Sequence, residues 1–110
     1  MNIQSFIENW IANSNAYNTD QYLECYQENA ILDDPSVGRK FTGREGIRAY
    51  FTSYFIEYNT QTRLVKLNSS DDEARIEVEF TGTFPEGQIG GTFDFKFKEG
   101  KIAFVKADLV

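Results

Sequence analysis

The sequence predicts one α+β domain, in which three helices pack in the concave face of a strongly curved antiparallel sheet. Two observations predict this class. Apolar residues recur at helical spacing up to residue 58, and beyond residue 60 they alternate with polar residues, as in strands with one buried face. The chain has 110 residues, which fits a single domain over 1–110 and leaves no room for a second.

The first half of the chain predicts two helices and a short strand before the main helix. Five apolar side chains share one face of an amphipathic helix over 3–14: Ile3, Phe6, Ile7, Trp10 and Ile11. A shorter helix fits residues 20–28. Residues 30–34 form a short strand, which Pro35 ends because it holds Asp34 in an extended conformation.

The third helix carries the strongest apolar pattern of the sequence. It starts with a capping box, in which Thr42 is the cap and Glu45 follows three residues later. Six residues then form one stripe: Ile47, Tyr50, Phe51, Tyr54, Phe55 and Tyr58. A core face and the aromatic wall of a pocket would use the same residues, so both interpretations stay open.

Four long strands follow, and the turns between them are short, which predicts an antiparallel meander. Apolar residues alternate with polar ones over 75–81 and 92–98, and residues 61–67 and 101–109 supply the other two strands. The pair Gly90-Gly91 interrupts the third of these strands. Glycine inside a strand is typical of a bulge or bend, which would curl the sheet around the helices.

The charge balance excludes several classes of partner. Acidic residues outnumber basic ones 17 to 11, giving a formal charge of −6. We therefore expect no nucleic-acid partner, because phosphate contacts need clustered Lys and Arg, and no docking on anionic membranes. No stretch approaches the ~20 apolar residues of a membrane span, and the N-terminus lacks the basic region of a secretory signal. A cytoplasmic protein is expected.

The chain contains no histidine and a single cysteine, Cys25. Ser–His and Cys–His catalysis are therefore excluded, and an internal disulfide cannot form. Zinc is disfavoured for the same reason, and no phosphate-binding glycine pattern is present. We expect no metal and no cofactor, so proton transfer must use carboxylates, Lys, Tyr or water.

Asp34 is the candidate catalytic residue. It shares a strand face with Leu32, whereas Asp33 points to the other face. A carboxylate at the mouth of an apolar cavity could act as a general base. The alternative is that Asp34, followed by Pro35 and Ser36, only stabilises a turn by accepting bonds from nearby backbone N–H groups.

The segment from Tyr22 to Phe55, YLECYQENAILDDPSVGRKFTGREGIRAYFTSYF, resembles the nuclear transport factor 2-like superfamily, most closely its SnoaL-like and ketosteroid isomerase branch. The order of helices and strands also agrees along the whole chain. This resemblance implies a cystatin-like half-barrel or cone and a homodimer, here expected through the outer sheet face. It also implies that Asp34 is the base, since the base of that family directly precedes a Pro-Val-Gly-like turn.

The other functional positions of the family differ here. The resemblance places Trp10 at the tyrosine of the oxyanion hole, Phe93 at its acidic partner and Phe51 at a supporting tyrosine. Trp10 still offers an indole N–H, and Tyr26 or Tyr54 could supply a hydroxyl. The epoxide-hydrolase members need an Asp–Arg–Asp set, but the inward positions of the late strands are uncharged: Val78, Phe80, Phe93, Phe95, Val105 and Ala107.

These observations predict an apolar pocket for a small apolar or aromatic molecule, lined by Phe55 and by the aromatic and strand residues just named. The protein would then be an isomerase, cyclase or lyase in which Asp34 transfers a proton on an apolar carbonyl compound. Two alternatives remain, a binding module without catalysis and a dimerisation module. Fold alone does not separate them, because one fold hosts unrelated activities.

Overall fold

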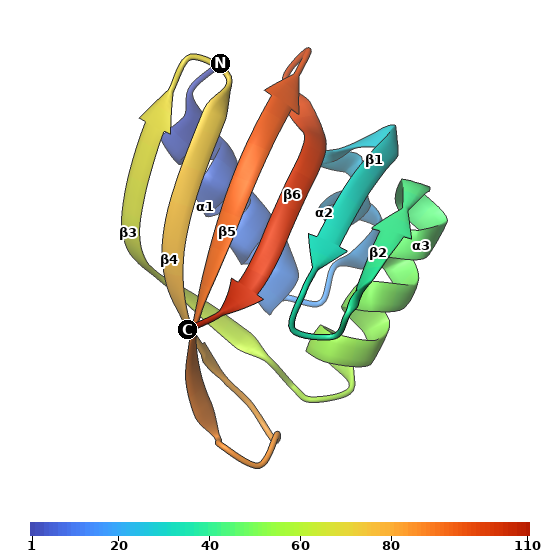
Figure 1. The fold of residues 1–110 in the computed structure, drawn as a ribbon, viewed down its shortest axis with the longest axis vertical. Helices are drawn as coiled ribbons and strands as arrows, with labels where there is room; N and C mark the ends of the chain where they lie inside the picture. The colour runs from blue at the N-terminus through green and yellow to red at the C-terminus, as the bar shows by residue number, and fades with distance from the viewer.

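A computed structural model describes all of residues 1–110. The helical elements are α1 (Ile3–Asn15), α2 (Thr19–Glu24), α3 (Gly43–Phe51) and the π-helical turn η1 (Thr52–Ile56). The strands are β1 (Tyr26–Asp34), β2 (Arg39–Thr42), β3 (Gln61–Ser70), β4 (Glu73–Thr81), β5 (Gln88–Lys98) and β6 (Lys101–Leu109). The helices cover one face of the sheet, which confirms the predicted α+β class (Figure 1).

The six strands form one open sheet in the order β2-β1-β6-β5-β4-β3. The meander from β3 to β6 is antiparallel, as predicted. The prediction of a wholly antiparallel sheet is wrong, because β1 pairs with β6 in parallel, with Leu32 opposite Val105. A parallel pair needs a long connection, and here β2, α3 and the meander supply it.

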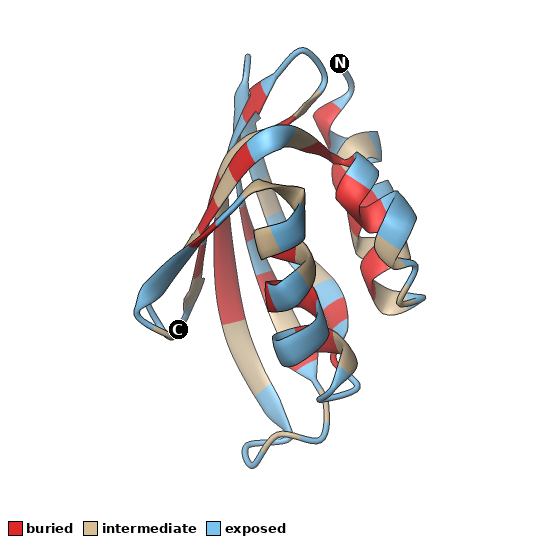
Figure 2. Cartoon of the chain, turned by 90° about the vertical axis from the view of Figure 1, so that its right-hand side faces the viewer, coloured by how far each residue is buried: buried red, intermediate tan, exposed pale blue.

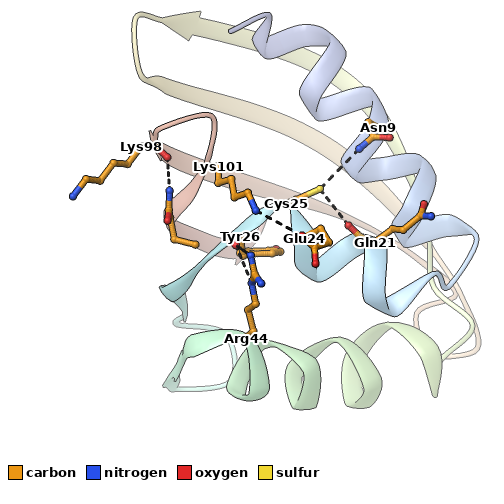
Figure 3. A network of polar contacts seen from close by, with 9 residues as sticks. Asn9, Gln21, Glu24, Cys25, Tyr26, Arg44, Lys98 and Lys101 are labelled. Carbon is orange, nitrogen blue, oxygen red and sulfur yellow. Dashed lines mark hydrogen bonds and ion pairs between the residues drawn. The ribbon is translucent and has the colours of Figure 1, made fainter.

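The second helix is shorter than the predicted 20–28, and the strand after it is longer than the predicted 30–34. The chain enters β1 at Tyr26 because tertiary partners take up its backbone. The amide of Ile102 donates to the carbonyl of Cys25 at 2.8 Å, and Arg44 donates from Nε and Nη2 to the carbonyl of Tyr26 at 3.1 and 2.8 Å (Figure 3). Pairing with β6 thus overrides the local helical pattern.

Two further local predictions need correction. Thr42 is the N-cap of α3, but its side chain makes no capping bond, so the predicted capping box does not form. Of the bulge or bend predicted at the glycine pair in β5, the bulge does not form, since pairing with β4 is continuous from Thr81 to Glu73. A Cβ on Gly91 would lie 2.4 Å from Cε2 of Phe80, so glycine is present to admit that ring.

The core lies between the helices and the concave sheet face, where the buried residues gather (Figure 2). The N-terminal helix packs here through Ile3, Ile7 and Trp10, as predicted. Its end is fixed to the edge strand β3, because the side chain of Asn15 accepts from the amide of Thr62 at 2.7 Å and donates to its carbonyl at 2.9 Å. None of the helices is long and apolar enough to cross a bilayer.

Candidate functional site

A cavity of about 270 Å³ opens at one end of the sheet, between η1 and the β4–β5 loop. Both of these segments lie at the lower end of the molecule in Figure 1, together with the β1–β2 turn. The lining side chains are Asp34, Ser36, Val37, Tyr50, Tyr54, Phe55, Tyr58, Thr60, Phe80, Phe84, Pro85, Glu86, Ile89 and Leu109. Most of them are hydrophobic, so a ligand here would meet an apolar surface with a few polar groups.

Asp34 ends β1 on the same face as Leu32 and is only 5% exposed. Its Oδ1 accepts from the amide and the hydroxyl of Ser36, at 2.9 and 2.5 Å, which fixes the β1–β2 turn. Its Oδ2 accepts from the hydroxyl of Tyr50 at 2.7 Å. The same carboxylate therefore stabilises the turn and borders the cavity, and Oδ2 keeps one lone pair for a ligand.

Tyr50 is the main polar partner of Asp34 and comes from the buried face of α3. Burial raises the pKa of this tyrosine well above its usual value, and the negative charge of Asp34 and the hydrogen bond to it act in the same direction. Tyr50 therefore stays protonated, and its hydroxyl donates a hydrogen bond to Oδ2. Tyr50 belongs to the predicted apolar stripe, which did not indicate this role, although its position one turn before Tyr54 was the available signal.

The π-helical turn brings two tyrosines to the rim of the cavity. The amide of Glu57 donates to the carbonyl of Thr52 at 3.0 Å, five residues back, which widens the helix beyond the α form. Tyr54 and Tyr58 are 37% and 40% exposed there, whereas Phe55 is buried beneath them. Such π turns are common at functional sites.

The β4–β5 loop forms the opposite wall and is fixed to the end of η1. The amide and the hydroxyl of Thr83 both donate to the carbonyl of Tyr58, at 2.7 and 2.9 Å. The Phe84 ring stands edge-on to the Tyr58 ring, with centroids 6.3 Å apart. A Cβ on Gly82 would lie 2.7 Å from the same carbonyl, so glycine permits this close approach. Loop residues follow no periodic pattern, so no sequence signal indicated this wall.

Of the sequence-predicted site residues, four line the cavity: Asp34, Tyr54, Phe55 and Phe80. The others lie deeper, in the packed core: Trp10, Tyr26, Phe51, Val78, Phe93, Phe95, Val105 and Ala107. There the Trp10 ring meets Phe93 and Phe95 edge-on, with centroids 5.0 and 5.2 Å apart. The aromatic interior is thus filled with its own side chains, and the hollow is confined to its open end.

The polar atoms of this core satisfy one another. The indole N–H of Trp10 donates to the hydroxyl of Tyr26 at 3.1 Å, and the hydroxyls of Tyr22 and Tyr26 share a bond of 2.8 Å. Burial raises the pKa of both tyrosines well above the usual value. Trp10 and Tyr26, the predicted donors to a ligand, therefore use their polar atoms in hydrogen bonds within the core. Tyr54 and Tyr58 are the tyrosines that line the cavity at its exposed rim.

A metal has no evident set of ligands, since no three carboxylate or thiol side chains lie close enough to coordinate one. Cys25 is buried beside Asn9 and Gln21 (Figure 3). The pKa of the thiol is raised to about 11, mainly by burial, so the thiolate is disfavoured at neutral pH. The chemistry available at the cavity is that of two carboxylates, Asp34 and Glu86, of tyrosine hydroxyls and of an apolar wall.

A family model described as the SnoaL-like domain matches residues 7–105. No curated protein matches the chain. One similar solved structure is that of the epoxide hydrolase/cyclase-like enzyme SalBIII, which has a role in pyran ring formation in the polyether salinomycin. It is 20% identical, with a TM-score of 0.84 over 97% of this chain and 89% of that one.

Two other structures were solved with small molecules. A Mycobacterium tuberculosis protein in complex with estradiol-17β-hemisuccinate is 14% identical, with a TM-score of 0.80 over 94% of this chain and 90% of that one. A hypothetical protein of ketosteroid isomerase-like fold from Catenulispora acidiphila, in complex with trimethylamine, is 16% identical, with a TM-score of 0.83 over 93% and 82%. At these identities the likeness shows a shared fold.

Proposed function

The chain belongs to the SnoaL-like domain family, within the nuclear transport factor 2-like fold that its sequence resembles, and we propose that its cavity binds a small, largely apolar carbonyl compound on which Asp34 acts as a general base. The observation that carries this proposal is a nearly buried carboxylate at the wall of an apolar cavity. That similar structures hold a steroid ester or a small amine supports a ligand-binding role for the fold.

The proposed step is a proton transfer at the carbon next to the carbonyl. Oδ2 of Asp34 takes the proton, and the electron pair of the broken C–H bond moves into the carbonyl to give an enolate. Return of the proton to another carbon completes an isomerisation, and loss of a leaving group completes an elimination. Phe55 and Phe80 line the cavity beside the base and exclude water from it.

The enolate oxygen requires a hydrogen-bond donor, because charge develops there in the transition state. Tyr54 and Tyr58 line the cavity, and their hydroxyls are the proposed donors. Tyr50 would act as a positioning residue, holding Oδ2 in place through the bond of 2.7 Å. In this arrangement the donors come from η1 and the residues just after it, not from the core residues Trp10 and Tyr26.

The test is turnover of an identified substrate by Asp34→Asn. Removing a general base typically costs about 10²–10⁴-fold in rate, so kcat should fall by that order while the substrate still binds. Asp33→Asn is the matched control, because Asp33 lies next in sequence on the opposite strand face. Unchanged turnover by Asp34→Asn would remove Asp34 from the mechanism.

One observation favours a second function, ligand binding without catalysis. Both oxygens of Asp34 already accept hydrogen bonds, and the indole N–H of Trp10 is used within the core. In this case Asp34 serves the β1–β2 turn, and the cavity only holds its ligand. Bound ligand recovered chemically unchanged after long incubation with the wild type would support this function and oppose the catalytic one.

A homodimer through the outer sheet face remains a prediction. On that face, Arg75 pairs with Asp94 at 2.7 Å and Arg63 pairs with Glu79 at 3.0 Å, so these charges are balanced within one chain. Balanced charges lower the cost of covering the face, compared with unpaired ones. The molar mass in solution at micromolar concentration tests this prediction, and a monomer mass would contradict it.

A further inference from the structure

We propose that the ligand of this cavity carries a positively charged amino group; this inference rests on the proposed function, since it names the class of molecule that the same cavity binds. The charges of the lining carry the argument. Two carboxylates border the cavity, Asp34 at its inner wall and Glu86 at the exposed rim, and no lysine or arginine lines it. A cavity with this lining attracts cations and repels anions.

The carboxylate of Asp34 has no cationic partner within the chain. Its hydrogen-bond partners are the amide and hydroxyl of Ser36 and the hydroxyl of Tyr50, all of them neutral. A carboxylate that is 5% exposed normally pairs with a cation, because removing a charge from water is costly. The position of that missing partner is on the cavity side, where a ligand would sit.

Two arginines near this end of the sheet are held elsewhere. Arg39 lies opposite Asp34 in the β1–β2 ladder, but its guanidinium sits over the Phe41 ring, 4.3 Å from the centroid. Arg63 pairs with Glu79 on the outer sheet face. The negative charge in the cavity is therefore not neutralised by the protein, and a cationic ligand would neutralise it.

The aromatic rings of the rim suit the same ligand. Tyr54, Tyr58 and Phe84 border the entrance, and the rings of Tyr58 and Phe84 stand at 68° to each other, forming two walls of a corner. An ammonium group is attracted to the faces of such rings, and more strongly where water is excluded. The rest of the ligand would contact Phe55, Phe80 and Ile89, which explains why the inner wall is apolar.

The experiment compares three compounds of similar size by isothermal titration calorimetry on the full chain. Benzyltrimethylammonium is the cation, neopentylbenzene is its uncharged carbon isostere and 4-tert-butylbenzoate is an anion. We expect the cation to bind at least about tenfold more tightly than the isostere, and the anion to bind most weakly. Adding salt should weaken the binding of the cation and leave the binding of the isostere unchanged.

Two variants separate the cavity from the general acidity of the protein. Glu86→Gln should weaken the binding of the cation several-fold and leave the binding of the isostere unchanged, because it removes one carboxylate from the rim. Glu8→Gln is the matched control, since it makes the same change of net charge at an exposed position of α1. An equal effect of both variants on the cation would overturn the inference, because bulk charge would then explain the preference.

The remaining outcomes distinguish this inference from the proposed function. If the isostere and the cation bind equally well, the amino group is not recognised, and the cavity stands as a site for uncharged ligands. If none of the three compounds binds, both the inference and the proposed cavity function fail. A cation-selective response that Glu86→Gln reduces and Glu8→Gln retains supports both.

Discussion

The deep core and the cavity end of the molecule, here called the mouth of the cone, contain the same kinds of side chain but behave differently. In the core, Trp10 packs against Phe93 and Phe95, and its N–H is satisfied by Tyr26. At the mouth, Tyr54 and Tyr58 are about two-fifths exposed. Burying aromatic area in a filled core stabilises the fold, whereas the incompletely covered rings of the mouth are free to contact a ligand.

The largest expected effect separates these two regions by stability. Trp10→Ala should lower the free energy of unfolding by about 3–5 kcal/mol, because it leaves a cavity among buried rings and removes the donor to Tyr26. Tyr54→Ala, at the rim, should cost about 1 kcal/mol or less. Urea unfolding of both variants checks this difference. Losses of equal size would mean that the mouth is as well packed as the core.

The next effect concerns the hydrogen bond that joins α3 to β1 at the cavity wall. Tyr50→Phe should lower the free energy of unfolding by about 2 kcal/mol, since it removes a donor from a nearly buried carboxylate. Tyr54→Phe is the control, because it removes a hydroxyl at the rim that takes no part in the bonds to Asp34. Equal stability of the two variants would show that the bond to Asp34 contributes nothing.

A third variant tests the close approach that links the strands to the cavity. Gly91→Ala should cost about 1–3 kcal/mol, because the new Cβ would lie 2.4 Å from Cε2 of Phe80 and 3.2 Å from the carbonyl of Asp108. Gly90→Ala should cost less, since its Cβ would meet mainly the side chain of Val110, which is 84% exposed. Thermal unfolding compares the two. A larger loss for Gly90→Ala would contradict the packing argument.

The same contrast explains what the sequence could predict. Regular apolar spacing predicts α1 and the strands of the meander, because each buries one continuous face. Alternation also tells which face of a strand points inward, as for Val78, Phe80 and Phe93. It does not tell how deep each residue lies along the cone, and therefore did not separate Phe80 at the mouth from Val78 and Phe93 in the core.

The other gaps concern contacts between segments that are far apart in the chain. The parallel pairing of β1 with β6 decides where α2 ends, and no local pattern around Tyr26 indicates it. The bond from Tyr50 to Asp34 joins residues 16 apart on a helix and a strand, and depends on how the two pack. The wall formed by Phe84 and Glu86 comes from a loop, where side chains follow no period.

The last prediction concerns the buried tyrosines of the core, whose effect on stability is small at neutral pH and grows in alkali. Burial is the first cause that raises the pKa of Tyr22 and Tyr26 well above the usual value of about 10. Above about pH 10 the unfolded chain loses these protons while the folded chain keeps them, so the unfolded state binds fewer protons and stability falls as the pH rises. Below about pH 10 this contribution is fully present.

Tyr22→Phe removes one such group, so its free energy of unfolding in urea should fall less steeply with pH above about 10 than that of the wild type. An unchanged slope would mean that the hydroxyl of Tyr22 ionises as readily in the fold as in the unfolded chain, and that the core is wetter than its packing indicates.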